Sequence, residues 1–258
     1  MRLRGEAVEL RRPKRILSLR RTAYNGEPQD GLSSCARRRK FSILWNTVGS
    51  RQIMQYNDGV KITKEQESAV IGMVLGDAYL QKTGELNARL RLEQQADHAE
   101  YLVWKARLLP QLFQGKPTFL KRIHSQTHRE YSYVRQQSNA GSYLGRIRKI
   151  FYPDGKKKIP KSLSRWLKSD IGFAIWFYDD GYYFKRDRAF YLYLGTVSPE
   201  EASIAHETIE RNFGLRSTVL DKKKKGFAIY FPVSEREKIV HILSKYPVPV
   251  MGYKVPAL

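Results

Sequence analysis

The chain has 258 residues, of which 47 are lysine or arginine and 25 are aspartate or glutamate, so its formal charge is +22 at pH 7. Its 41% apolar content is enough for a folded core, its single cysteine excludes an internal disulfide, and it lacks the apolar run of ~18 residues that a membrane helix needs. Such a charge predicts a polyanionic partner, with nucleic acid first, although a ribosomal-type structural protein or a membrane-surface binder shares it.

The beginning of the chain differs in composition from the rest. Two basic clusters, Arg11–Arg15 and Arg37–Lys40, flank a stretch rich in turn-forming residues, and apolar periodicity is weak throughout. We therefore expect residues 1–60 to form a basic, largely disordered arm, in which only Phe41–Trp45 fits a short packed element. A mitochondrial transit peptide and an upstream extension without function are the alternative interpretations of this arm.

Residues 61–160 show an orderly pattern that predicts helix, strands, helix, strands and helix. The segment Thr63–Gln66 is a capping box and predicts a helix that continues to about Leu80. Alternation of apolar and charged side chains over Asn87–Gln94 predicts a half-buried strand. The further elements expected in this half are a helix at 97–113, strands at 118–123 and 130–135, and a helix at 140–151.

Residues 161–258 repeat the same order of elements, which indicates an internal duplication. Helices are expected to begin at Ser169, at Ser198 with proline in the first helical position, and at Ser234. Together the two halves predict an α+β fold built from two related units. The strands expected between these helices lie at 189–196, 216–220 and 226–231.

An acidic residue ends the first helix of each half. The first helix reads VIGMVLGDA over residues 70–78, and the second reads FAIWFYDDG over residues 173–181. Either helix alone is more typical of a core helix followed by a turn, but a carboxylate at a helix C-terminus is electrostatically disfavoured. If the two helices pack through their small residues, Asp77 and Asp180 meet at one end, where a divalent cation would relieve their repulsion.

With these segments the sequence resembles the LAGLIDADG homing endonucleases in their two-motif, single-chain form, and within them the omega-type intron-encoded branch. The segments Lys156–Pro160 and Gly252–Pro256 agree with two lysine-bearing segments of that family. The resemblance covers about residues 60–258. It implies two pseudo-symmetric αββαββα units, residues 61–160 and 161–258, whose strands form a saddle for DNA and whose motif helices pack at the interface.

The function implied by the resemblance is that of a monomer that cuts both strands of a long, asymmetric DNA site. Cleavage would use divalent ions, usually Mg²⁺, with Mn²⁺ as a substitute and Ca²⁺ supporting binding without cleavage, and would leave short 3′ overhangs. An intron RNA maturase and a non-catalytic DNA-binding regulator on the same fold are the alternative functions. No membrane partner is expected.

The resemblance also implies which residues hold the metal. Asp77 and Asp180 occupy the metal-ligand position of the two motifs, with Ala78 and Asp179 adjoining them. Because Asp179 directly precedes Asp180, a shift of one residue would exchange their roles, and register with Asp77 favours Asp180. No side chain is expected to form a covalent intermediate.

Further side chains are implied to act beside the two aspartates. The lysines would stabilise developing negative charge or polarise the attacking water, and polar strand residues would orient that water. In the second half, Val197 stands where many members carry a glutamine, so we expect water to be held less well there. The residues implied are Lys254, either Lys157 or Lys158 (both fit the second lysine), Glu93 and Gln94.

Candidate DNA contacts lie on one predicted strand and in one predicted turn. Arg89 and Arg91 share the polar face of the strand and would contact phosphate or guanine, although a solvated face is nearly as typical for either alone. A hairpin turn is expected to bring four lysines to phosphate, namely Lys222, Lys223, Lys224 and Lys225. Alternating tyrosines are more typical of packing than of base stacking, and these are Tyr131, Tyr133, Tyr191 and Tyr193.

Overall fold

The computed structural model describes residues 44–48, 51–55, 59–123, 125 and 128–256. The chain divides into two units, residues 1–40 and 41–258, and everything described belongs to the second unit. Most of the arm expected at the beginning of the chain therefore lies outside the described residues.

The end of that expected arm forms strands, where we had predicted disorder with at most one short element. β1 (Leu44–Val48) pairs with β2 (Arg51–Gln55), and β2 pairs with β3 (Lys61–Thr63), in an antiparallel three-stranded sheet. The register places Ile53 opposite Thr63. Because β3 leads directly into the first helix, its backbone supplies an edge on which the other two strands can pair.

The capping box predicted at Thr63 starts α1 (Lys64–Leu75). The Thr63 hydroxyl accepts a hydrogen bond from the Gln66 N–H at 3.1 Å, and the Gln66 side chain accepts one from the Thr63 N–H at 3.2 Å. The helix ends before the predicted Leu80, because β4 (Tyr79–Lys82) follows it, a strand that the residue pattern did not locate but that the implied αββαββα unit contains.

The remaining elements of the first half follow the predicted order. The second helix is shorter than predicted at both ends, because a 3-10 turn holds Ala96–His98 and the chain leaves the helix after Arg107; no side chain caps its start. The elements are β5 (Ala88–Gln95), α2 (Ala99–Arg107), β6 (Thr118–Ile123), β7 (Glu130–Gln137) and α3 (Ser142–Phe151).

The second half repeats the order of elements of the first, as predicted, with a short additional helix and with a first strand whose residues the pattern did not locate. Its longest helix begins at the predicted Ser198 with proline in the first turn, and Ser198 forms a capping box in which it accepts from the Glu201 N–H at 3.1 Å. Its last helix begins after a 3-10 turn and has no side-chain cap at Ser234. The elements are α4 (Leu163–Trp166), α5 (Asp170–Asp180), β8 (Gly181–Phe184), β9 (Ala189–Gly195), α6 (Pro199–Phe213), β10 (Thr218–Asp221), β11 (Phe227–Phe231) and α7 (Arg236–Ser244).

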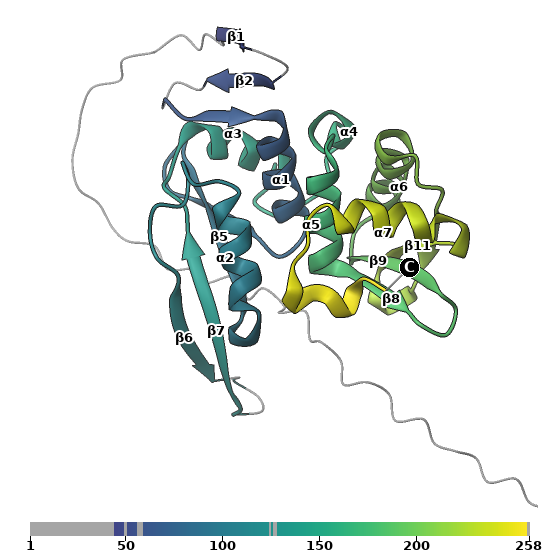
Figure 1. Ribbon diagram of the computed structural model, residues 1–258. Coiled ribbons are helices and arrows are strands. Elements are labelled where there is room, and N and C mark those ends of the chain that lie inside the picture. The colour runs from purple at the N-terminus through teal and green to yellow at the C-terminus, as the bar shows by residue number, and fades with distance from the viewer. Residues whose placement is uncertain (1–43, 49–50, 56–58, 124, 126–127, 257–258) are drawn as a thin grey trace, which may run out of the picture. The chain divides into compact units, whose positions relative to one another are not determined.

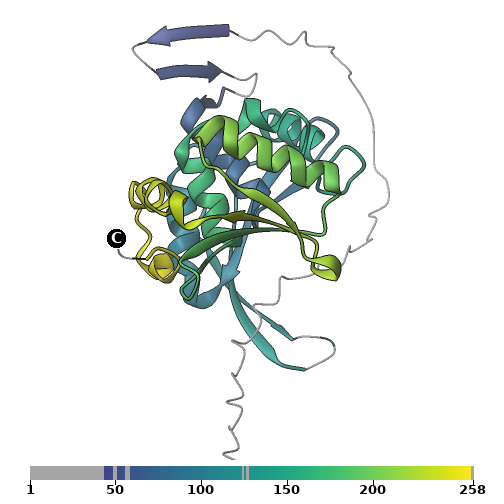
Figure 2. The same cartoon turned by 90° about the vertical axis from the view of Figure 1, so that its right-hand side faces the viewer.

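The strands of the two halves form two antiparallel four-stranded sheets, which confirms the α+β class. Their orders are β4-β5-β7-β6 and β10-β11-β9-β8. In β5 the predicted alternation holds: Leu90 and Leu92 are buried beneath α2 and α3, and Arg89 and Arg91 lie on the other face. In the second sheet α6 contacts β10 and β11 and covers one face (Figure 2). Among the described helices, none combines the length and apolar character that crossing a membrane requires.

The helices α1 and α5, which we call the motif helices, pack directly against each other and join the two halves (Figure 1). A Cβ atom on Gly72 would overlap the carbonyl of Gly172, so the backbones approach as closely as glycine allows. Near the helix starts, the Ser68 hydroxyl accepts a hydrogen bond from the Ser169 N–H at 3.0 Å and lies 3.2 Å from the Ser169 carbonyl. The helices therefore run in the same direction, and their C-terminal ends meet.

Candidate active site

Asp77 and Asp180 lie where the motif helices end and the two sheets begin. Asp77 follows the cap of α1 and precedes β4, and Asp180 is the last residue of α5, directly before β8. The Asp77 N–H donates to the carboxylate of Asp179 at 3.1 Å, which links the two helix ends. The structure thus brings together the two acids that the sequence singled out, one from each half.

Both carboxyl groups lie in surroundings that disfavour their charge. Burial, followed by the negative charge of Asp77, raises the pKa of Asp180 well above its ordinary value, against the opposing charges of Lys157 and Lys254. Asp77 stays open to solvent, yet the protein atoms packed around its carboxyl group and the charge of Asp179 raise its pKa too. A divalent cation would relieve this repulsion.

Asp179, the neighbour that a one-residue shift would exchange for Asp180, is engaged in a different way. Its side chain is fully buried, and Oδ1 lies 3.0 Å from Nζ of Lys105, whose side chain is 1% exposed. Its Oδ2 accepts the Asp77 N–H, and a Cβ atom on Gly76 would overlap this carboxylate. Because both oxygens are bound within the protein, Asp179 serves as a structural partner here, in contrast to its expected place beside the metal.

Two lysines reach the ends of the motif helices in equivalent ways. Nζ of Lys157 donates to the Gly76 carbonyl at 2.6 Å, and Nζ of Lys254 donates to the Asp179 carbonyl at 3.0 Å. Each of these carbonyls belongs to the residue just before an aspartate of the site. Burial lowers the pKa of Lys254, and the nearby aspartates counteract this effect. Both lysines therefore place positive charge beside the acids.

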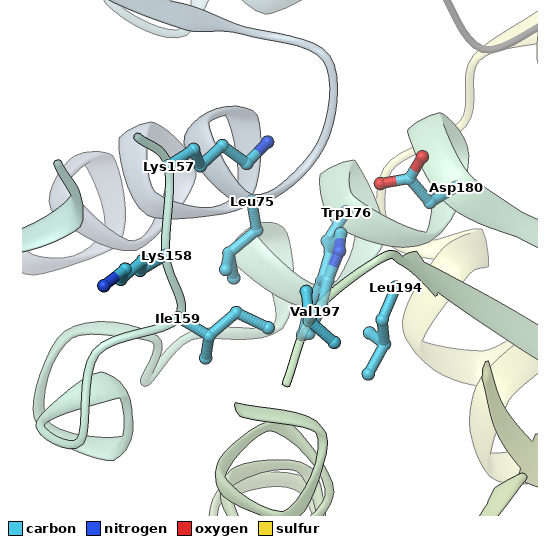
Figure 3. Close-up of a pocket in the computed structure, with 8 residues that line it drawn as sticks. All are labelled: Leu75, Lys157, Lys158, Ile159, Trp176, Asp180, Leu194 and Val197. Carbon is cyan, nitrogen blue, oxygen red and sulfur yellow. The ribbon is translucent and has the colours of Figure 1, made fainter. Parts of the chain in front are cut away.

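Of the two lysines that fit the first of these positions, the structure brings Lys157 to the aspartates. Figure 3 shows the Lys157 ammonium and the Asp180 carboxylate pointing toward each other, whereas Lys158 points away. Lys158 forms an exposed ion pair with Asp154 at 2.9 Å. Spacing along the sequence fits two adjacent lysines equally well. The structure distinguishes them because their side chains point in different directions.

Of the two adjacent polar residues near the end of β5, likewise only one reaches the aspartates. Nε2 of Gln94 donates to Oδ2 of Asp77 at 3.1 Å. Glu93 faces the other side of the sheet, where it accepts hydrogen bonds from Arg91 (from Nε, at 2.8 Å) and from Arg135. Successive side chains of a strand alternate between faces, so Gln94 reaches the aspartates and Glu93 does not.

Val197 occupies, in the second half, the place that Gln94 holds in the first. Each lies the same number of residues after the aspartate of its own half. Gln94 lies near the end of β5, and Val197 follows the end of β9; these strands pair with β4 and β8, which the aspartates precede. Val197 and Asp180 line the same small pocket, together with apolar side chains that include Leu194 and Trp176 (Figure 3). The position that corresponds to Gln94 thus holds an apolar side chain in the second half, whereas Asp77 accepts a hydrogen bond from an amide; Lys157 also lines the pocket beside Asp180.

Sequence reasoning missed Lys105, which lies on α2 among apolar residues. Besides its ion pair with Asp179, its ammonium lies 4.3 Å from the centroid of the Tyr101 ring. The Tyr101 hydroxyl donates to the Ile175 carbonyl at 3.2 Å, so this turn of α2 is tied to α5 at two points. The available signal was a lysine one helical turn after a tyrosine on an otherwise apolar helix face.

The expected DNA contacts lie on the outer face of the first sheet and in one turn of the second. Arg89 hydrogen-bonds Gln137 at 3.3 Å, and Arg91 is joined to Glu93. The lysine run Lys222–Lys225 forms the turn between β10 and β11, as predicted, and three of its residues make a 3-10 turn.

The aspartates of the site fit a divalent ion only in part. Within the described residues, no three His, Cys, Asp or Glu side chains are grouped as a complete metal site. Mg²⁺ is commonly bound by one or two carboxylates together with substrate phosphates and water, so Asp77 and Asp180 match the protein's share of such a donor set. Ala78, expected beside them, is buried, and its N–H donates to the Met73 carbonyl at 2.9 Å.

Comparison with known proteins gives both a family and a fold. The sequence model of the LAGLIDADG DNA endonuclease family matches residues 67–239. "Probable intron-encoded endonuclease 1" of Wickerhamomyces canadensis is 25% identical over 222 residues, which are 84% of this chain and 95% of that protein. "Cytochrome b mRNA maturase bI2" of Debaryomyces hansenii is 25% identical over 202 residues, 75% of this chain and 74% of that protein. A solved structure of the homing endonuclease I-WcaI bound to its DNA recognition sequence has the same fold, with a TM-score of 0.68 and 23% identity over 76% of this chain and 87% of that one.

Proposed function

The chain belongs to the LAGLIDADG DNA endonuclease family, and we propose that it is a homing endonuclease that cuts both strands of a long, asymmetric DNA site. One observation carries the proposal: Asp77 and Asp180, one from each half, meet at the ends of the packed motif helices, where burial and then the charge of Asp77 raise the pKa of Asp180. Pure DNA binding has no use for acids placed where phosphates approach. Metal-dependent hydrolysis, in contrast, needs such acids to hold the metal ion next to the phosphate.

Binding in this proposal uses the outer faces of the two sheets. Each sheet begins next to one aspartate, so a duplex lying across both outer faces would bring its backbone to the acids between them. The first sheet offers Arg89 and Arg91, and the second offers the lysine run Lys222–Lys225. Positive charge at these places and the net charge of +22 favour a long DNA site bound by a single chain.

The chemistry in this proposal is phosphodiester hydrolysis that leaves short 3′ overhangs. Mg²⁺ held by Asp77 and Asp180 would supply Lewis-acid stabilisation and an activated water. Lys157 and Lys254 fix the main chain just before each aspartate and place positive charge where negative charge develops on the cleaved phosphate. Gln94 orients the carboxylate of Asp77 and, through it, the water of the first half.

A cleavage selection on a randomised duplex library tests the proposal directly. We expect a single long sequence to be enriched in Mg²⁺ and none in EDTA, and we expect end mapping of the cut duplex to give short 3′ overhangs. Enrichment that is the same with and without metal, or blunt or 5′-extended ends, would contradict it. Ca²⁺ should support binding of the enriched duplex without cutting.

The relative from Debaryomyces hansenii, described as a maturase, favours one second candidate, which is assistance in the splicing of an intron RNA. A gel-shift assay with a structured intron RNA and a splicing assay test this function apart from DNA cleavage. If no duplex is enriched but the chain binds the RNA and promotes its splicing, the maturase becomes the better assignment.

A further inference from the structure

The outer face of the second sheet carries a set of tyrosines in place of the charged residues of the first sheet. We call Tyr182, Tyr191, Tyr193 and Tyr230 the tyrosine face; they come from β8, β9 and β11. Tyr191 lies directly opposite Tyr182 on one neighbouring strand and opposite Tyr230 on the other. The Tyr191 ring centroid is 5.3 Å from that of Tyr230 and 6.4 Å from that of Tyr193.

The tyrosine face is open although its members pack on one another. Alternate residues of the same strands, such as Phe190, Leu192 and Ile229, are buried in the core, so the tyrosines point away from it. Tyr182 is 42% exposed and Tyr193 is 43% exposed. The expected role of these tyrosines in packing therefore accounts for the contacts among them, but it leaves large apolar ring surfaces in contact with solvent.

The two sheets thus present different chemistry on equivalent faces. The outer face of the first sheet carries Arg91 and Arg135, which both donate to Glu93, and Arg89, which donates to Gln137. Its tyrosines, Tyr131 and Tyr133, lie on β7 among these charged groups, and the Tyr133 hydroxyl accepts from Arg135 at 3.3 Å. On the second sheet, positive charge lies at the margin of the rings: Nζ of Lys222 is 5.2 Å from the Tyr191 ring centroid. This arrangement of cations around an apolar centre suits phosphates at the edge and an apolar group in the middle.

We infer that the tyrosine face recognises the 5-methyl groups of thymines in the major groove of one half-site. The thymine methyl is the main apolar feature that a base pair presents in that groove, whereas guanine offers acceptors that suit arginine. The first sheet, with its arginines, would therefore read its half-site by hydrogen bonds, and the second would read a thymine-rich half-site by apolar contact. This inference rests on the proposed DNA site.

Replacement of thymine by deoxyuridine tests the inference, because it removes the methyl group and keeps every hydrogen-bonding atom. A duplex selected for binding by the full chain in Ca²⁺ is synthesised with uracil for thymine in one half-site at a time. We expect a loss of affinity of about fourfold for each contacted methyl group in one half-site and less than twofold in the other. A selected site without thymines, or equal losses in both half-sites, would overturn the inference.

Protein variants show whether the tyrosines are responsible. In Tyr193→Ser and Tyr182→Ser chains, the penalty for uracil in the sensitive half-site should disappear. Tyr131→Ser is the matched control, because Tyr131 lies on the first sheet and is 42% exposed. In this variant the loss of affinity caused by uracil in the sensitive half-site should equal that of the parent. A penalty that persists in both test variants would overturn the inference. Cleavage of the unmodified duplex in Mg²⁺ reports on the proposed function separately.

Discussion

The surroundings of Asp77 and of Asp180 share a backbone arrangement but differ in their side chains. In both halves the aspartate follows a motif helix and precedes a strand, and a lysine donates to the carbonyl just before it. Asp77, however, has the Gln94 amide at 3.1 Å, whereas the corresponding place beside Asp180 holds Val197. The duplication has thus kept the acids and the lysine contacts, and it has let the residues around them diverge.

A second difference lies one residue before each aspartate. Gly76 precedes Asp77, whereas Asp179 precedes Asp180 and forms a buried ion pair with Lys105. This pair lies nearer to the first aspartate than its chain position suggests, because Asp179 accepts the Asp77 N–H. The second motif thus supplies part of the support for the acid of the first. Under the proposed function, this asymmetry predicts that the two DNA strands are cut at unequal rates.

The largest expected effect is the one that both halves share. Asp77→Asn and Asp180→Asn should each reduce cleavage by at least ~10³-fold, which corresponds to ~4 kcal/mol in the barrier. Binding of the cognate duplex in Ca²⁺ should stay within about tenfold of the parent, because phosphate and base contacts dominate affinity. Asp154→Asn is the matched control: it removes an exposed carboxylate paired with Lys158 and should cleave normally. Full cleavage by the Asp77→Asn, Asp180→Asn double variant would end the nuclease assignment.

The buried ion pair should matter most for stability. Lys105→Met leaves the Asp179 carboxylate buried without its partner cation and should lower the free energy of unfolding by about 3 kcal/mol or more, measured by urea denaturation. Adding Asp179→Asn should recover part of the loss. Lys158→Met removes an exposed ion pair that water screens, and it should leave the free energy of unfolding nearly unchanged. Equal losses in the two lysine variants would argue against an essential buried pair.

Adjacent lysines offer a sharper comparison for catalysis. Lys157→Met should slow cleavage by roughly 10²-fold, because it removes the positive charge beside the acids, while Lys158→Met should stay within about twofold of the parent. Single-turnover rates on the cognate duplex measure both. If Lys158→Met proved the slower variant, the roles assigned to the two lysines would be reversed.

Exchange of Gln94 and Val197 for each other's residue type should change the ratio of the cleavage rates of the two DNA strands. Gln94→Val removes the amide from Asp77 and should slow the cut made in one strand by about tenfold, the effect of roughly 1.4 kcal/mol, while leaving the other strand nearly unchanged. Val197→Gln should speed the opposite cut by a smaller factor. Nicking rates of strands labelled separately decide this, and a uniform slowing of both strands by Gln94→Val would mean that the two acids act as one site.

The smallest expected effect concerns stability without metal. The folded protein holds a proton on Asp77 and Asp180 more tightly than the unfolded chain does, because both pKa values are raised. Stability should therefore increase as pH falls through the raised pKa toward 3.8 and decrease as pH rises. Asp180→Asn should melt at a higher temperature than the parent at pH 7, and Ca²⁺ should raise the melting temperature of the parent more than that of the variant. Melts between pH 4 and 8 check both.

Local signals were enough to predict much of the fold. The capping box at Thr63 depends on residues three positions apart and forms as predicted, and the helix expected to begin at Ser198 with proline in its first position does so. The residue pattern did not locate the short strands β4 and β8, because each has only four residues and follows a motif helix too closely for a period to be recognised; the αββαββα unit implied by the resemblance includes both. Most of the arm lies outside the described residues and stays a prediction.

The sequence located the segments of the candidate site, but it was limited in choosing between adjacent residues that could fill the same role. Three adjacent pairs show this limit: Asp179 and Asp180, Lys157 and Lys158, and Glu93 and Gln94. Register with Asp77 favoured Asp180 in the first pair, and the structure shows the Asp179 carboxylate bound to Lys105 and to the Asp77 N–H. In the other two pairs one side chain reaches the aspartates and the other does not, and the three-dimensional structure shows which one does. Lys105 was beyond reach for a different reason, since its partner comes from the other half of the chain.

The glycine contact between the motif helices has a consequence for the product of cleavage. Because Gly72 meets the carbonyl of Gly172, main chain and not adjustable side chains sets the separation of Asp77 and Asp180. Under the proposed function, that separation determines how many base pairs lie between the two nicks, so the contact acts as a molecular ruler for the overhang. A larger residue at Gly72 would change the separation of the two aspartates, and with it the length of the overhang, as well as weaken the fold.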